Sequence, residues 1–231
     1  GLGDRAYKFR IAADGEVIEA ELPPEMAPET VVASVTKNIP NARIGDLEKK
    51  RRDGREVFEA EVRVGEDEYE LTIGTDGTLL EGELPVKAAP APVLQAAQKM
   101  ADGLEFRALK FENGNGQPRY RFEGRIDRDG YEIDIAATGQ VLGMRMPTSR
   151  VPKIVTDAAL KAAPGVRFGR TTQCKLEDNR KVYAITGRLN DGEVQVRVAE
   201  AGEVIDVKTL RAQNEGKGDG GMGAKPPREN A

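Results

Sequence analysis

The chain has 231 residues, of which 39% are hydrophobic and 32% are charged, with a formal net charge of −4 and a pI near 5.3. This length fits two ordinary domains or one elongated array of small ones, and the apolar content is too high for a disordered protein. Lys and Arg are interspersed with Asp and Glu, which excludes the basic footprint of a nucleic-acid-binding protein, and no apolar run of about 18 residues predicts a membrane span.

The side chains on which most enzymes depend are scarce. The chain contains no His and a single Cys, Cys174, which removes the commonest general base and any Cys-rich metal site. We expect Cys174 to be a small, buried, inert thiol. The only serines, Ser34 and Ser149, lie outside any Gly-x-Ser-x-Gly sequence. A carboxylate-pair hydrolase stays open on composition, but we expect no enzymatic activity, no cofactor and no metal.

The sequence repeats itself at a spacing of about 62 residues. Asp14-Gly15 recurs as Asp76-Gly77, and Tyr7, Tyr69 and Tyr131 follow the same spacing. The predicted organisation is the second half of a truncated repeat at 1–23, full repeats at 24–85, 86–147 and 148–210, and a flexible Gly- and Pro-rich tail at 211–231.

The third repeat slips by one residue. Phe168 matches Phe106 at a spacing of 62, whereas Tyr183 matches Tyr120 at 63. The extra residue therefore lies between Phe168 and Tyr183. We expect it at the turn Glu177-Asp178-Asn179, because hairpin tips tolerate insertions.

Each repeat opens with a segment that predicts a helix. In the first repeat, Pro28 favours a helix start and Pro40 a helix end. The residues with helical spacing are Val31, Val32, Val35 and Ile39. The corresponding residues are Val93, Leu94, Ala97 and Met100 after Pro90 or Pro92, and Ile154, Val155, Ala158, Ala159 and Ala162 after Pro152.

The remainder of each repeat alternates with a period of two, as Phe58, Ala60 and Val62 do. Asp53-Gly54 and Asp76-Gly77 are strong hairpin signals. We predict an α+β fold in which each unit of about 62 residues is one helix followed by an antiparallel meander of about four strands. The units form an extended sheet with the helices on one face, because a sheet with one apolar face needs one covering layer.

The other face of this sheet is predicted to stay open. It carries Glu59, Glu61, Arg63, Arg119, Arg121, Glu123, Arg125, Glu132 and Asp134. A protein or peptide partner could bind along such a face, as partners do on other repeat proteins. The alternative for each residue is that its charge only keeps the sheet soluble.

Two short motifs fail the test of context. Gly218, Gly220 and Gly223 fit G-x-G-x-x-G, but no strand precedes them and no helix follows, so we interpret them as tail composition. Asp127 and Asp129-Gly130 resemble the start of a calcium loop, but they stand between two alternating runs and predict a hairpin turn.

The segment Glu68–Glu81, with Tyr69, Leu71 and Ile73 before Asp76-Gly77, resembles the strand–turn–strand of PepSY-like domains. These domains are similar in fold to the tandem units of beta-lactamase inhibitor protein. The resemblance covers most of residues 5–210. It implies an exported protein, periplasmic or extracellular, that acts by binding, for example as an inhibitor or regulator of a peptidase or other enzyme. No inhibitory residue is carried over.

The first residue, Gly1, is not an initiator Met, which a removed export signal or a trimmed tag would explain. The leading functional prediction is a non-catalytic exported protein that binds a protein or peptide partner through its open sheet face. The alternative is a structural spacer of the cell envelope with no specific ligand.

Overall fold

The computed structural model describes residues 8–101, 103–114, 116–178, 180–190 and 192–210. Within these residues the fold is α+β, with three α-helices and one antiparallel sheet of 14 strands. The strand order follows the chain from β1 to β14, so each strand pairs with its neighbours in sequence. The expectations for residues 1–7 and for the tail at 211–231 lie outside the described residues.

The sheet begins with a hairpin of β1 (Phe9–Ile11) and β2 (Val17–Leu22). The first group comprises the 3-10 turn η1 (Pro24–Met26), helix α1 (Glu29–Asn38) and strands β3 (Arg43–Arg52), β4 (Arg55–Val64), β5 (Asp67–Gly74) and β6 (Leu79–Leu84). The second group comprises η2 (Val86–Ala88), α2 (Ala91–Met100), β7 (Glu105–Gly114), β8 (Gln117–Ile126), β9 (Asp129–Ala136) and β10 (Val141–Pro147). The third group comprises η3 (Thr148–Arg150), α3 (Lys153–Ala162), β11 (Arg167–Glu177), β12 (Arg180–Leu189), β13 (Gly192–Ala199) and β14 (Val204–Leu210).

The same element order thus recurs along the chain, a turn and a helix followed by strands. The units at 24–85, 86–147 and 148–210 stay a prediction, because element order does not test whether each segment is a separate folding unit.

The helices start where proline predicts. Pro28, Pro90 and Pro152 occupy the N-cap positions of α1, α2 and α3. A proline costs little there, because its missing N–H would have no partner within the helix.

Fewer residues of each helix are buried against the sheet than the helical spacing of the sequence predicts. Val31 and Val35 are buried in α1, as Val155 is in α3. Val32 and Ile154 were predicted to belong to the buried stripes, but their exposed fractions are 44% and 55%. Each precedes or follows a buried valine by one residue, and a rotation of about 100° per residue turns it away from the sheet.

The one-residue slip of the third repeat is absorbed inside a strand. Glu177 pairs with Arg180, so the β11–β12 connection keeps the two-residue spacing that separates Arg52 from Arg55. The expectation of an insertion at Glu177-Asp178-Asn179 is therefore wrong. Instead, the register of the β11–β12 pairing shifts between Phe168 and Thr172. A β-bulge there accommodates the extra residue without lengthening the turn.

The turn between the third and fourth strands of each group lies close to the start of the helix. Gly77 has φ +84°, and a Cβ there would stand 2.8 Å from the Thr30 carbonyl oxygen. At the equivalent turn of the second group, a Cβ on Gly139 would stand 3.1 Å from the Pro92 carbonyl oxygen. Gly15, in the hairpin that no described helix covers, has φ +89° and no atom within 4 Å.

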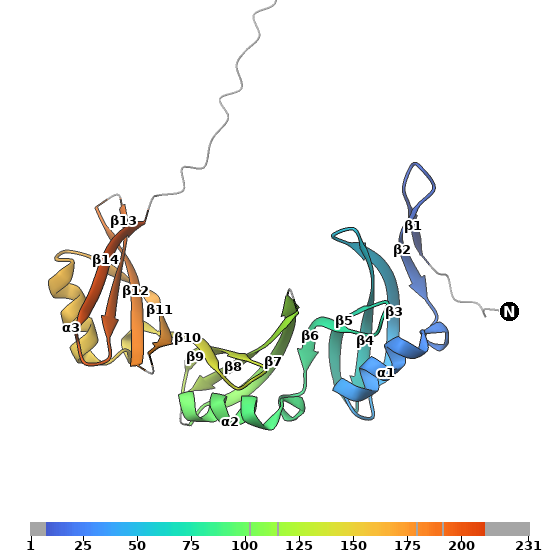
Figure 1. The fold of residues 1–231 in the computed structure, drawn as a ribbon, viewed down its shortest axis with the longest axis horizontal. Helices are drawn as coiled ribbons and strands as arrows, with labels where there is room; N and C mark the ends of the chain where they lie inside the picture. Colours follow the sequence, from blue (N-terminus) through green and yellow to red (C-terminus); the bar gives the residue numbers. More distant parts are fainter. Residues whose placement is uncertain (1–7, 102, 115, 179, 191, 211–231) are drawn as a thin grey trace, which may run out of the picture.

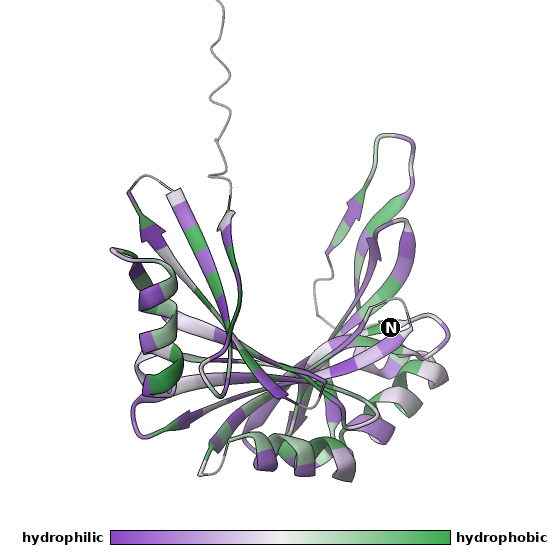
Figure 2. Ribbon diagram, turned by 60° about the vertical axis from the view of Figure 1, so that its left-hand side comes forward, coloured by the Kyte–Doolittle hydropathy of each residue, from purple (hydrophilic) through white to green (hydrophobic). Residues whose placement is uncertain are grey.

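The helices all cover the same face of the sheet, and the groups follow one another along an arc (Figure 1). Leu71, Ile133 and Val196 lie beneath the helices and are fully buried. The strands are banded, with hydrophilic and hydrophobic residues alternating (Figure 2). The hydrophilic bands form the opposite, open face, which no described helix covers.

We predict that Gly77→Ala destabilises the protein more than Gly15→Ala. Both substitutions force a non-glycine residue into the left-handed region, at a cost of about 1–2 kcal/mol. Only Gly77→Ala also forces the turn away from α1, which should add about 1–3 kcal/mol. Urea unfolding followed by circular dichroism measures the difference, and equal losses for the two variants would contradict this account of the turn.

Candidate partner-binding face

The predicted open-face residues lie on three strands. Glu59, Glu61 and Arg63 belong to β4, Arg119, Arg121, Glu123 and Arg125 belong to β8, and Glu132 and Asp134 belong to β9. Each alternates with residues of the core, such as Ala60, Phe122 and Ile133, whose exposed fractions are zero. The alternation places all nine on the face away from the helices.

On the second group these charges neutralise one another across neighbouring strands. Arg121 Nε lies 2.7 Å from Asp134 Oδ1, and an Arg145 guanidinium nitrogen lies 2.5 Å from Glu132 Oε2. Lys110 Nζ lies 2.9 Å from Glu123 Oε1. Cross-strand pairs of opposite charge stabilise a sheet, so much of the charge here is already satisfied within the chain.

Four of the predicted residues line a shared hollow at the junction of the second and third groups. Arg119, Arg121, Glu132 and Asp134 border a space of about 330 Å³ that also reaches Lys175 on β11. Both signs of charge occur in this hollow, but its cations, which also include Arg145, outnumber its two carboxylates.

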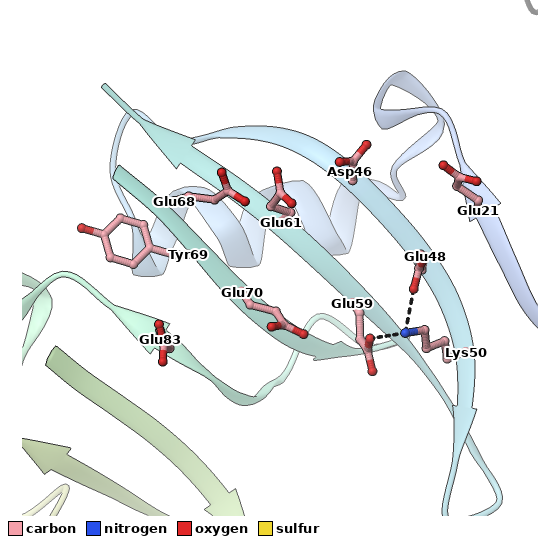
Figure 3. A pocket seen from close by; sticks show the side chains of 10 residues that line it. All are labelled: Glu21, Asp46, Glu48, Lys50, Glu59, Glu61, Glu68, Tyr69, Glu70 and Glu83. Atoms are coloured by element: carbon pink, nitrogen blue, oxygen red, sulfur yellow. Dashed lines mark hydrogen bonds and ion pairs between the residues drawn. The ribbon is translucent and has the colours of Figure 1, made fainter. Parts of the chain in front are cut away.

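The open face of the first group is different, because carboxylates dominate it. The described residues that line a hollow of about 600 Å³ include eight carboxylates and one ammonium group (Figure 3). We call this the acidic hollow; it is lined by Glu21, Asp46, Glu48, Lys50, Glu59, Glu61, Glu68, Tyr69, Glu70 and Glu83. Two of them, Glu59 and Glu61, belong to the predicted set.

Lys50 holds part of this charge in place. Its ammonium nitrogen lies 2.6 Å from Glu48 Oε2 and 2.5 Å from Glu59 Oε2 (Figure 3). These hydrogen bonds, with Glu48 first and Glu59 second, raise the pKa of Lys50 above its usual value despite partial burial. The ammonium group therefore stays charged throughout the neutral range.

Other carboxylates of the acidic hollow lack such a partner. Within the described part of the chain, Asp46, Glu70 and Glu83 take part in no ion pair. Asp46 and Glu70 are also exposed. Unpaired charges of one sign in a hollow concentrate the electric field, which favours an approaching cationic group.

Sequence reasoning missed most of the acidic hollow, which also draws on β2, β3, β5 and β6. The segment Arg43–Arg52 does not alternate plainly, because the register shifts between Ile44 and Asp46. Allowing one extra residue at Gly45 would have brought Asp46, Glu48 and Lys50 onto the open face. The sequence shows these charged residues, but their alternation alone does not show the bulge that decides which face of the sheet they occupy.

The other chemical candidates are accounted for by packing. Asp127 and Asp129 flank the β8–β9 turn, where their carboxylates accept hydrogen bonds of 2.9 and 2.5 Å from the Arg150 guanidinium. Cys174 is fully buried, and this burial raises the pKa of its thiol to about 11. Across the described ranges, no group of three or more His, Cys, Asp or Glu side chains could hold a metal ion. In the same ranges, no helix has the length and apolar character that a bilayer crossing needs.

No protein-family profile and no curated protein matches the chain. Among solved structures, it is similar to a BLIP-like protein of Bacteroides fragilis, with 14% identity and a TM-score of 0.41 over 57% of this chain and 92% of that one. A DUF2874 family protein of Bacteroides uniformis has 17% identity and a TM-score of 0.36 over 52% and 89%. The YpeB C-terminal domain of Bacillus megaterium has 13% identity and a TM-score of 0.26 over 81% and 99%. These neighbours include the kind of protein that the resemblance of Glu68–Glu81 predicted, and no functional residue is transferred from them.

We predict that Lys50→Met lowers stability by roughly 1 kcal/mol at low ionic strength, since two partly exposed ion pairs are lost and the surrounding carboxylates repel one another. The loss should shrink at about 0.5 M NaCl, where salt screens that repulsion. Thermal unfolding at two salt concentrations measures it. The control is Lys49→Met, which removes a single pair with Glu56 on the helix-covered face. A salt-independent effect of Lys50→Met would contradict an electrostatic role.

Proposed function

We propose that this protein is a non-catalytic binding protein that holds a protein or peptide partner on its open sheet face. The observation that carries the proposal is the acidic hollow, where eight carboxylates among the described lining residues face one ammonium group. The negative electrostatic potential of such a surface attracts cations and raises the association rate of a basic partner. The partner segment that fits is therefore rich in Lys or Arg.

Geometry supports the first group as the anchor of this site. The hollow of about 600 Å³ is the size of many ligand sites, and it opens on strands whose alternate residues are buried in the core. The nine predicted residues remain part of the proposed face. Those on β8 and β9 make a mixed, largely self-paired surface next to the acidic hollow. We assign them to the rim of the binding face, where paired charges contribute specificity more than affinity.

The absence of catalysis is likewise a proposal. The chain contains no His, and its single thiol is buried and protonated at neutral pH. The acidic residues of the hollow are exposed or half-buried rather than enclosed, so they lack the low-dielectric setting that tunes a catalytic carboxyl group. An exported location, periplasmic or extracellular, accompanies this proposal and rests on the resemblance of the Glu68–Glu81 segment.

We predict that the protein captures a basic partner from extracts of the source organism, and that binding weakens as NaCl is raised from about 50 to 500 mM. Reversing two unpaired charges, with Asp46→Lys and Glu70→Lys, should reduce retention at least about tenfold. Quantitative affinity capture followed by mass spectrometry measures the retention.

The matched control is Glu25→Lys with Glu66→Lys. Both residues are exposed, neither lines the acidic hollow, and the change in net charge is the same. If the control loses the partner as fully as the hollow variant, net charge rather than the hollow governs binding. If neither variant nor the unmodified protein retains a specific partner, the spacer function becomes the better account.

A further inference from the structure

The open face has a hollow at each of the two junctions between groups, and the two hollows correspond in position. The first junction hollow, of about 270 Å³, is lined mainly by β4, β5, β6 and β7. The second junction hollow is the space of about 330 Å³ already described, lined by β8, β9, β10 and β11. Gly82, the fourth residue of β6, faces Phe111, and Met144, the fourth residue of β10, faces Cys174. The linings can therefore be compared position by position.

The charge reverses between the two hollows. At three corresponding positions, a carboxylate in the first hollow stands where the second has a cation: Glu59 and Arg121, Glu83 and Arg145, and Glu112 and Lys175. The members of the first two pairs are each the fifth residue of their strand. Glu112 follows Phe111, and Lys175 follows Cys174, on the first strand of the next group.

The full linings show the same reversal. Among the described residues, five carboxylates and two cations line the first junction hollow, and four cations and two carboxylates line the second. Three carboxylates of the first junction hollow, Glu59, Glu70 and Glu83, also line the acidic hollow. The open face is therefore negative over the first group and the first junction, and positive at the second junction.

The cations of the second junction hollow differ in how they are paired. Arg121 and Arg145 pair within the hollow, as described above, and Arg119 Nε lies 2.7 Å from Glu112 Oε2 beside it. Lys175 is exposed and takes part in no ion pair within the described residues. Exposed ion pairs are weak and exchange readily with competing charges. An added carboxylate can therefore bind Lys175 and share the half-exposed Arg145.

The strands of the third group that adjoin this hollow add no unpaired carboxylate to it. Gln173 faces Ala184, and Ala184 faces Arg197 on the next strand. The carboxylates of Glu177 and Asp206 both pair with Arg197. An anionic group at the second junction hollow is therefore not repelled from this side.

We propose that the second junction hollow is a subsite for a carboxylate-bearing segment of the partner. This inference rests on the proposed function, because it describes the charge pattern of the same partner: a basic part lies over the acidic hollow, and an acidic part lies over the second junction. The step from β6 to β10 is four strands, which is about 19 Å along the sheet. An extended peptide advances about 3.3 Å per residue, so roughly six residues separate the two charged parts.

Three labelled synthetic peptides test the subsite. One carries a block of lysines, one a block of glutamates, and the third both blocks joined by about six Gly and Ser residues, the length estimated above. Fluorescence anisotropy at about 20 mM NaCl, where screening is weak, measures their affinities. We expect both single-block peptides to bind. The bipolar peptide should bind at least about tenfold more tightly than either, because its second block binds intramolecularly.

The variant that tests the subsite carries Arg145→Gln with Lys175→Gln. Both side chains are exposed, so the fold should be retained, which circular dichroism checks. We expect this variant to lose the acidic peptide and the extra affinity of the bipolar peptide, and to keep the basic peptide. The matched control carries Lys37→Gln with Lys99→Gln, which makes the same change in net charge at exposed positions on α1 and α2. The control should bind all three peptides as the unmodified chain does.

The peptides separate this proposal from the proposed function. An acidic peptide that does not bind, or that binds the Arg145→Gln, Lys175→Gln variant as well as the unmodified chain, would overturn the subsite. A bipolar peptide that binds no more tightly than the basic peptide would also overturn it. Failure of the basic peptide alone would count against the acidic hollow as a binding site, while the acidic peptide would still decide the subsite.

Discussion

The strand pairs between β6 and β7 and between β10 and β11 are the constraint on which the rest of the structure depends. A segment of about 62 residues with one helix buries too little surface to be very stable alone. Joining the segments edge to edge buries side chains such as Met144 and pairs backbone groups that would otherwise be exposed. Because the helices lie on one face, the same joining leaves a second face open along the array.

This separation of faces explains why the chain can carry so many charges and still pack a continuous core. Charged residues occupy alternate positions and pair across strands, as Arg121 does with Asp134. The first group departs from this balance, since its carboxylates outnumber the cations that could pair with them in the acidic hollow. Self-repulsion there is a cost to folding that a cationic partner would relieve, which is why the proposed function centres on this part of the face.

The pattern of the sequence was sufficient to predict the fold class and the direction of most strand residues. The alternation of Phe58, Ala60 and Val62 was plain, and these residues are buried. The pattern was not sufficient where one extra residue shifts the alternation of side chains between the two faces of the sheet. Bulges at Gly45 and between Phe168 and Thr172 change which side chains face outward, and the only local signal of each is one glycine within a strand, Gly45 and Gly169. Most of the acidic hollow was missed for two reasons. Three of its ten lining residues require the correct register in β3, and five others are brought in by the packing of β2, β5 and β6 beside β4.

The measurement that most directly tests this account is native-state hydrogen exchange at the junction strands. If β6–β7 and β10–β11 pairing makes one sheet, amides of β7 and β11 that face the preceding group should be protected to the same order as those of β8, inside a group. Exchange of the junction amides at the rate of exposed turns, with protection kept inside each group, would contradict it. The chain would then be a string of separate small domains, and a continuous binding face would not exist.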